Sequence, residues 1–246
     1  PTFIGNRIGI HGIMSVLHLA LKENIPFEVI DSVLGDAAAR AKSASFRTAD
    51  LAGVDIMAAT AKNVYDLCPN DEVRDTFKFP EFLQWMLDNK VLGNKTKQGF
   101  FKKDKGPDGK KLFLRLDPAT KSYVAQEKKD WPILKELKGI DEPVERVRAL
   151  FTSDSEAGRL AWRCVADNLI YAVNRLGEVT DLPLNVDRAI RNGFAFELGP
   201  FELWDALGVD RVVSRLRYEE RPVPALVEQM LAKGIASFYR MEHGVP

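Results

Sequence analysis

Apolar residues recur at steps of three and four along most of this chain, which is the spacing of one face of an α-helix. The clearest run predicts a long amphipathic helix over residues 6–24, with apolar positions at Ile10, Ile13, Met14, Leu17 and Leu21. The same spacing predicts further helices over 26–34, 56–67 and 80–89. The first half is therefore expected to be mainly helical.

Three glycines share one face of the first predicted helix, namely Gly5, Gly9 and Gly12. Each glycine inside a helix costs about 0.5–1 kcal/mol relative to alanine. Such a stripe indicates that something approaches the backbone closely, which is a ligand, another helix or a preceding domain. Helix packing alone explains the stripe equally well.

The pattern changes between residues 93 and 125, where glycine-rich loops separate short runs rich in aromatic and branched residues. Strand candidates are Phe100-Phe101, 112–116 and 122–124, and Pro107-Asp108-Gly109 has the residues of a turn. These features predict a small exposed β-hairpin or three-stranded meander. The charged residues that follow, together with the region of Pro143, are typical of a connection between two halves.

Several motifs of the first half recur in the second half in the same order. Residues 5–8 match 157–160, and residues 46–55 match 201–210. A period this long indicates a duplicated domain rather than a solenoid. The sequence therefore predicts a first helical repeat with a β-hairpin extension over residues 1–125, a linker over 126–153 and a second helical repeat over 154–246.

Composition excludes several classes of function. The chain has 246 residues, is 46% hydrophobic and balances 35 Lys and Arg against 35 Asp and Glu, so a nucleic-acid partner is not expected. No apolar run is long enough to predict a membrane span. Cys68 and Cys164 lie far apart and form no C-x-x-C pair, which favours structural thiols in a reducing, cytoplasmic setting.

The residues that usually carry hydrolytic or metal chemistry are sparse. His11, His18 and His243 are the only histidines, and none has the spacing of a metal site. No nucleophile and base are paired in a way that predicts a stand-alone hydrolase or transferase. The glycines form no G-x-G-x-x-G turn after a strand, so no NAD site is expected within this chain.

The first residues, Pro-Thr-Phe-Ile-Gly-Asn-Arg-Ile-Gly, place Asn6 near a helix start, where asparagine most often caps the backbone. However, this stretch resembles the hinge of the NAD-dependent 3-hydroxyacyl-CoA dehydrogenases, in which a Rossmann domain is followed by a helical C-terminal domain. Thr2 stands where that pattern has Gly. Residues 193–205 are similar to the G-x-x-x-x-x-G-P-F-E-L-x-D stretch of the same family, and 92–101 are similar to its L-G-x-K-x-x-x-G-F-Y.

The resemblance implies an all-α fold made of two copies of the family's helical C-terminal unit, with a small β-hairpin insertion and without the Rossmann domain. It implies the substrate-side part of an enzyme that oxidises 3-hydroxyacyl-CoA to 3-oxoacyl-CoA in fatty-acid β-oxidation and that is inactive as a fragment. NAD and a His–Glu pair would belong to the preceding Rossmann domain. Residues 42–48 look closer to bacterial proteins that also carry an enoyl-CoA hydratase module.

The same resemblance implies which residues meet the acyl-CoA substrate. Asn6 matches the family's active-site asparagine, and Ser43, Phe46 and Thr48 lie in the loop that approaches the substrate. This loop lacks the family's Gly-Pro. The second copy has Gly158 where the first has Asn6, so one active site is expected per chain.

Two further interpretations belong beside this one. Asp50 and Asp205 occupy matching positions in the two copies, and a structural role at a helix start or between helices is favoured for both. The whole chain is alternatively a non-catalytic helical module that binds acyl-CoA or holds an assembly together.

Overall fold

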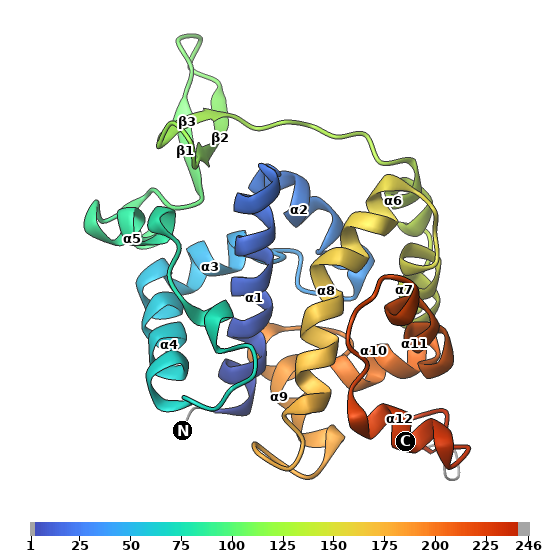
Figure 1. Ribbon diagram of the computed structural model, residues 1–246. Coiled ribbons are helices and arrows are strands. Elements are labelled where there is room, and N and C mark those ends of the chain that lie inside the picture. The colour runs from blue at the N-terminus through green and yellow to red at the C-terminus, as the bar shows by residue number, and fades with distance from the viewer. Residues whose placement is uncertain (1–2, 241–246) are drawn as a thin grey trace.

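The computed structural model describes residues 3–240 and consists mainly of helices (Figure 1). Residues 1–2 and 241–246, which include Thr2 and His243, lie outside the described residues. The central helix α1 (Ile4–Glu23) carries the predicted apolar stripe and begins two residues before the predicted start. It ends at Asn24, which adopts a left-handed φ of 53°. Asparagine tolerates this conformation better than most residues, so it suits the end of a helix.

Four further helices make up the described part of the first half, and three of them were predicted, whereas the helix over residues 46–52 was not. They are α2 (Phe27–Val33), α3 (Phe46–Ala52), α4 (Val54–Leu67) and α5 (Glu81–Asp88). The 3-10 turns η1 (Asp36–Ala38) and η2 (Arg74–Phe77) lie between them, and η3 (Asn94–Thr96) follows α5. Pro26 and Pro80 each precede a helix, where the missing N–H of proline costs nothing. Gly53 separates α3 from α4 with a φ of 107°, a conformation that favours glycine.

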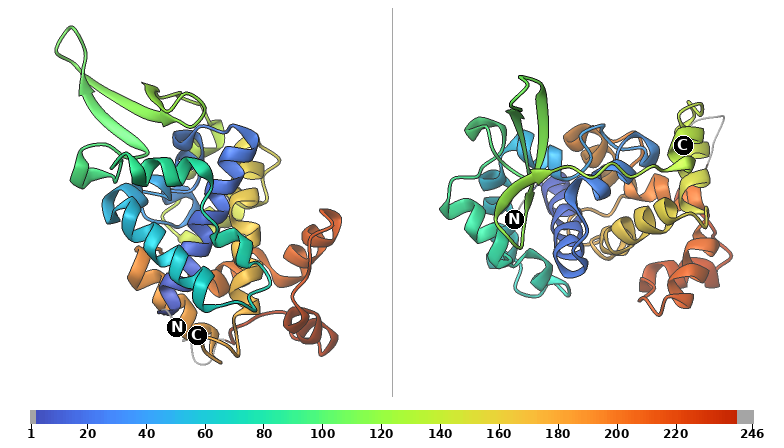
Figure 2. Two further views of the ribbon diagram at one scale, coloured as in Figure 1. Left: turned by 60° about the vertical axis from the view of Figure 1, so that its left-hand side comes forward. Right: turned by 90° about the horizontal axis from the view of Figure 1, so that it is seen from above.

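The predicted β region is a three-stranded antiparallel meander with the strand order β1-β2-β3. Its strands are β1 (Phe101–Lys105), β2 (Lys111–Asp117) and β3 (Ser122–Ala125). Lys103 of β1 lies opposite Phe113 of β2. The sheet projects from the helical body, as the views in Figure 1 and Figure 2 show. The prediction of a small exposed sheet at this place is therefore confirmed.

The segment expected to be a linker contains two helices, α6 (Pro132–Leu137) and α7 (Pro143–Phe151). Residues 126–131 cross the molecule as an extended strip from the sheet to α6 (Figure 1). Val147 and Leu150 of α7 are fully buried in the common core. The segment does connect the two halves, but α7 is packed against α8 and α10 rather than being a simple connection.

The second half contains five helices in an order that matches the first half. They are α8 (Glu156–Asn174), α9 (Pro183–Phe194), α10 (Pro200–Leu207), α11 (Val209–Tyr218) and α12 (Ala225–Ala232). Ser155 caps α8, because its Oγ accepts a hydrogen bond of 3.0 Å from the Gly158 N–H. Gly199-Pro200 leads directly into α10, as the sequence predicts.

The two aspartates at matching positions make the same contacts. The Asp50 carboxylate accepts hydrogen bonds of 2.8 and 2.9 Å from the N–H groups of Phe100 and Phe101. The Asp205 carboxylate accepts hydrogen bonds of 2.8 and 2.9 Å from the N–H groups of Phe238 and Tyr239. Both aspartates therefore have a structural role, but they hold a non-helical segment rather than a helix start or a contact between helices, and the repeated geometry supports the duplication.

A second pair of aspartates repeats in the same way, although the sequence did not single it out. The Asp31 carboxylate accepts hydrogen bonds from three backbone N–H groups at the start of α3, those of Ser45, Phe46 and Arg47. The Asp187 carboxylate accepts hydrogen bonds from the N–H groups of Phe201 and Glu202 at the start of α10. Each carboxylate thus caps the third helix of its half.

The two halves meet along α1, which lies beside α8 at the centre of the molecule (Figure 1). A Cβ atom on Gly5 would lie 3.0 Å from the carbonyl oxygen of Ala189 in α9, and one on Gly12 would lie 3.1 Å from Asn168 in α8. A Cβ on Gly9 would overlap the ring of Phe194. The glycine stripe therefore serves close packing against helices of the second half.

Candidate active site

Asn6 lies in the first turn of α1, and its side chain is exposed. The helix cap is Phe3 rather than Asn6, so the simplest interpretation of this asparagine as a capping residue is wrong. Among residues 3–240 the Asn6 side chain has no hydrogen-bond partner. Its amide is therefore free to donate and accept at the surface.

A cleft of about 540 Å³ opens beside Asn6, between α1, α3, α4 and α9. We call it the Asn6 cleft. Its walls are mostly apolar, and they are formed by Phe3, Ile4, Gly5, Ile10, Ile13, Thr48, Ala49, Ala52, Ile56, Met57, Thr60, Ala189, Gly193 and Phe194. Phe3 and Ile56 are strongly exposed, at 85% and 56% of their surface. An apolar cleft with one free amide at its edge suits a substrate that has an alkyl chain and a carbonyl or hydroxyl group.

The other three predicted site residues, Ser43, Phe46 and Thr48, differ in their position relative to the Asn6 cleft. Thr48 lines the Asn6 cleft together with Asn6. Ser43 contacts Thr48, with 2.7 Å between their hydroxyl oxygens, but does not itself line the cleft. Phe46 is fully buried, and its ring lies 4.6 Å from that of Phe27. The Phe46 side chain thus packs inside the protein instead of facing a ligand.

The hydroxyl of Thr48 is already engaged within its own segment. It donates a hydrogen bond of 2.7 Å to the carbonyl oxygen of Ala44, so Ser43 is the donor in the contact between the two hydroxyls. The Asp31 carboxylate fixes this segment because it accepts hydrogen bonds from the three N–H groups at the start of α3. Burial raises the pKa of the Asp31 carboxyl to about 7, although the same hydrogen bonds act to lower that pKa. Thr48 is therefore placed by a rigid local network.

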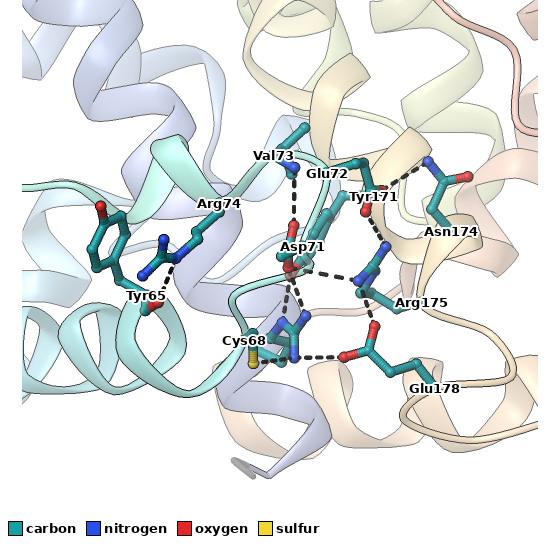
Figure 3. A network of polar contacts seen from close by, with 11 residues as sticks. Tyr65, Cys68, Asp71, Glu72, Val73, Arg74, Tyr171, Asn174, Arg175 and Glu178 are labelled. Atoms are coloured by element: carbon teal, nitrogen blue, oxygen red, sulfur yellow. Dashed lines mark hydrogen bonds and ion pairs between the residues drawn. The ribbon is translucent and has the colours of Figure 1, made fainter.

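A buried polar cluster, part of which Figure 3 shows, holds α1 at Arg7, the residue that follows Asn6. The Arg7 guanidinium is 1% exposed and lies 2.6 Å from the Asp71 carboxylate, which is fully buried. Arg7 also donates to the Tyr171 hydroxyl over 2.5 Å, and that hydroxyl donates to Asp71 over 2.7 Å. We call Arg7, Asp71 and Tyr171 the Arg7 cluster. It ties the first turn of α1 to α8 and so limits how far Asn6 can move.

The Arg7 cluster also determines the charge states of its members. Burial alone would raise the pKa of Asp71, but the hydrogen bonds from Tyr171 and Arg7 outweigh it and hold that pKa below its usual value. Next to the cluster, the His11 ring stacks on Tyr171 with 3.8 Å between ring centroids. Burial lowers the pKa of His11 to about 4, so this imidazole is neutral at pH 7.

The first turn of α1 adds a positive electrostatic potential to the Asn6 cleft. The first N–H groups of a helix have no acceptor within the helix and carry partial positive charge. The first turn of α1 contains no acidic side chain that would neutralise it. Asn6 and these N–H groups are therefore suited to an oxygen atom that gains negative charge.

The sheet of the described residues differs from that of a Rossmann dinucleotide site. The sheet among residues 3–240 is an antiparallel meander, whereas the Rossmann site requires parallel strands joined through a glycine-rich turn and a helix. Within the same residues, His, Cys, Asp and Glu form no group of three or more that could hold a metal ion. No helix in this part of the chain is long and apolar enough to span a membrane.

A comparison with protein-family models identifies the chain. The model for the C-terminal domain of 3-hydroxyacyl-CoA dehydrogenase matches residues 3–103 and 158–239. This chain belongs to the 3-hydroxyacyl-CoA dehydrogenase family. The matched residues include Asn6 and the residues that line the cleft, so the cleft lies within the part of the chain that the family shares.

Named relatives agree with this membership of the 3-hydroxyacyl-CoA dehydrogenase family. A probable 3-hydroxyacyl-CoA dehydrogenase of Bacillus subtilis (strain 168) is 38% identical over 244 residues, which is 99% of this chain and 30% of that protein. A putative fatty acid oxidation complex trifunctional enzyme of Rickettsia felis is 26% identical over 204 residues, 82% of this chain and 27% of that protein. The chain thus spans less than a third of the length of these relatives.

A solved structure shows the same fold. The crystal structure of 3-hydroxybutyryl-CoA dehydrogenase from Escherichia coli K12 superposes with a TM-score of 0.60. The match covers 95% of this chain and 61% of that chain, at 19% sequence identity. The mainly helical architecture expected from the dehydrogenase resemblance is therefore confirmed.

Sequence reasoning missed the Arg7 cluster. Asp71 and Tyr171 are separated by 100 positions along the chain and follow no shared motif. The only local signal was Arg7 itself, an arginine on the apolar side of an amphipathic helix, which requires an acidic partner when it is buried.

Proposed function

We propose that this chain is the substrate-side helical part of an NAD-dependent 3-hydroxyacyl-CoA dehydrogenase and that the acyl group occupies the Asn6 cleft. The observation that carries the proposal is the position of Asn6, whose free amide stands at the edge of an apolar cleft at the open start of α1. The reaction would be oxidation of 3-hydroxyacyl-CoA to 3-oxoacyl-CoA, as in fatty-acid β-oxidation.

In this proposal Asn6 positions the reacting end of the substrate. Its amide N–H donates to an oxygen of the bound acyl group, and the apolar walls of the cleft receive the hydrocarbon chain. The positive end of α1 stabilises the same oxygen as its negative charge grows. Thr48 also lines the cleft, and Ser43 supports Thr48 through their hydroxyl contact.

The remaining chemistry is assigned to parts outside this chain. A preceding Rossmann domain would bind NAD and supply the His–Glu pair that removes the hydroxyl proton, and the antiparallel sheet of residues 3–240 is consistent with this assignment. A fragment without that domain would be inactive. The proposal also includes an enoyl-CoA hydratase module in a longer protein, and relatives named as putative fatty acid oxidation complex trifunctional enzymes support a multifunctional protein. The buried free thiols of Cys68 and Cys164 suit a reducing cytoplasm.

The test is NADH-dependent reduction of acetoacetyl-CoA by the full-length protein with Asn6→Ala. Loss of one donor to a developing oxyanion lowers kcat by about 10²-fold. Asn63→Ala is the matched control, because Asn63 is also an exposed helical asparagine but does not line the cleft. If Asn6→Ala turns over as fast as Asn63→Ala, Asn6 has no part in the reaction.

A second candidate function is a non-catalytic module that binds acyl-CoA or a partner subunit. The exposed apolar surface of Phe3 and Ile56 beside the cleft would suit this role as well. The same assay separates the two functions. Acyl-CoA binding by a full-length protein that shows no NADH-linked turnover would favour the binding module.

A further inference from the structure

The Asn6 cleft has an open end and a closed end along α1. Phe3, at the start of the helix, is strongly exposed, whereas Ile10 and Ile13 are buried. Asn6, Ile10 and Ile13 follow one another at steps of four and three residues, so they lie on one face of the helix. Because each residue advances a helix by about 1.5 Å, Ile13 lies about 10 Å beyond Asn6. An apolar floor of this length therefore leads inward from the free amide.

One wall of this floor comes from the second half of the chain. Ala189, Gly193 and Phe194 of α9 all line the cleft. The Phe194 ring lies against the backbone of α1 at Gly9, because a Cβ atom on Gly9 would overlap the ring carbon Cζ. Gly9 follows Asn6 by three residues, which places the ring about 4.5 Å further along the helix axis. The half that has no counterpart of Asn6 thus shapes the cleft that Asn6 borders.

A second aromatic contact fixes the Phe194 ring. Its centroid lies 6.2 Å from that of the Phe196 ring, in an edge-to-face arrangement. The Arg40 guanidinium lies over Phe196, with 4.8 Å to the ring centroid. Between the two rings the chain turns at Ala195, which has a φ of 53° and ends α9. The Phe194 ring is therefore a fixed part of the cleft wall.

The matching position of the first half carries no ring. Phe194 lies seven residues after the capping residue Asp187 and directly before a residue with a φ of 53°. Ala38 lies seven residues after the capping residue Asp31 and is also directly followed by a residue with a φ of 53°. The repeated geometry is therefore built equally well with a methyl group at this position. The ring occurs only in the half whose α9 borders the Asn6 cleft, which indicates that it serves the cleft rather than the fold.

We propose that Phe194 makes the Asn6 cleft discriminate between acyl chains by their length, an inference that rests on the proposed function. An extended chain advances roughly 1.3 Å per bond. An acetoacetyl group ends one bond past its reacting carbon and stops short of the ring, whereas a 3-oxodecanoyl group continues for about 9 Å and lies against it. The ring thus contacts acyl chains of more than about six carbons. Phe194 stabilises these longer chains and takes no part in the reaction.

The test measures binding of butyryl-CoA and decanoyl-CoA to the full-length protein by titration calorimetry. Phe194→Ala should lower the affinity for decanoyl-CoA about tenfold, because the chain loses contacts equivalent to roughly two buried methylene groups. The affinity for butyryl-CoA should change less than about twofold. Phe79→Ala is the matched control, since Phe79 is also partly buried but does not line the cleft. Equal losses for the two ligands in Phe194→Ala, or the same selective loss in Phe79→Ala, would overturn the proposal.

A conservative variant guards against a loss of folding. Phe194→Leu keeps an apolar side chain in the wall, so its selective loss for decanoyl-CoA should be about threefold. An equal response of Phe194→Leu to the two ligands would again overturn the proposal.

Kinetics separate this inference from the proposed function. In Phe194→Ala the kcat/KM for 3-oxodecanoyl-CoA should fall about tenfold relative to that for acetoacetyl-CoA, and the kcat for acetoacetyl-CoA should not change. A full-length protein that shows the selective loss in binding but no NADH-linked turnover would refute the proposed function alone. Normal turnover with an unchanged ratio between the two substrates would refute the role of Phe194 alone.

Discussion

Replacing Asp71 by asparagine removes the only fully buried carboxylate of the Arg7 cluster. In the native protein this carboxylate lies 2.6 Å from Arg7 and 3.6 Å from Arg175, and both guanidinium groups are almost completely buried. An amide of the same shape leaves two buried positive charges without their shared counter-charge. We therefore expect the substitution to destabilise the junction of α1 with α8, which supports Asn6.

The expected magnitude follows from burial and from the remaining partners. Removing one partner of a buried ion pair costs about 3–5 kcal/mol. Glu178 lies 3.0 Å from Arg7 and also pairs with Arg175, but its carboxylate is 45% exposed and compensates only in part. We therefore expect a loss of about 3 kcal/mol, which corresponds to a melting temperature about 6–12 °C lower for a chain of this size.

Thermal unfolding followed by far-ultraviolet circular dichroism at neutral pH measures this loss. The control is Asp55→Asn, since Asp55 pairs with Lys95 at the surface, where both side chains are more than a third exposed. That variant should lose less than about 1 kcal/mol. If Asp71→Asn is no less stable than Asp55→Asn, the Arg7 cluster does not anchor α1.

Acid provides an independent check on the same carboxylate. Its pKa is depressed in the folded protein, so its contribution is complete above the unfolded-state pKa of about 4 and is lost as pH falls through the lower folded-state value. The difference in stability between wild type and Asp71→Asn should therefore shrink below about pH 4. A difference that stays constant into acid would contradict the assigned role of the charge.

Two further predictions concern a glycine and a histidine. Gly93 and Gly177 both have positive φ, but only at Gly93 would a Cβ clash with backbone, at 2.3 Å from the Asp50 carbonyl oxygen. Gly93→Ala should therefore cost about 3 kcal/mol or more and Gly177→Ala about 1 kcal/mol, and similar losses in urea unfolding would contradict the geometry. Neutral, buried His11 has a pKa of about 4, so wild-type stability should fall by up to about 3 kcal/mol between about pH 6.5 and 4. His11→Gln should flatten that part of the pH profile, and an unchanged slope would show that His11 does not titrate there.

The sequence predicted most of the helices and strands because residues close together in the chain specify the backbone geometry of each one. The apolar steps of α1 and α4, the prolines before α2 and α5, and the turn residues between β1 and β2 each specify backbone geometry within a few residues. The repeated Asp50 and Asp205 could be assigned a structural role for the same reason. Asp205 occurs in the half that has no counterpart of Asn6, so the sequence favoured a role in the fold rather than in catalysis for both aspartates.

What the sequence did not predict depends on contacts between distant segments. Phe46 was expected to meet the substrate, yet it packs against Phe27 and Phe100, and nothing in its neighbourhood along the chain indicated that aromatic cluster. The partners of Arg7 are Asp71, just before η2, and Tyr171 in α8, and both lie more than 60 positions further along the chain. The apolar residues of α7 alternate with charged residues, so the sequence of this segment was interpreted as a linker and its buried face was not predicted.

The difference between the two halves at the candidate site has a steric cause. Gly158 stands in α8 where Asn6 stands in α1, and a Cβ there would lie 2.5 Å from the carbonyl oxygen of Leu150 and 2.7 Å from that of Ser153. The end of α7 thus covers the first turn of α8, whereas the first turn of α1 opens into the Asn6 cleft. Restoring an asparagine at position 158 would require α7 to move, and α7 is held in the core by Val147 and Leu150. Position 158 in the second half therefore cannot take an asparagine side chain unless the end of α7 moves.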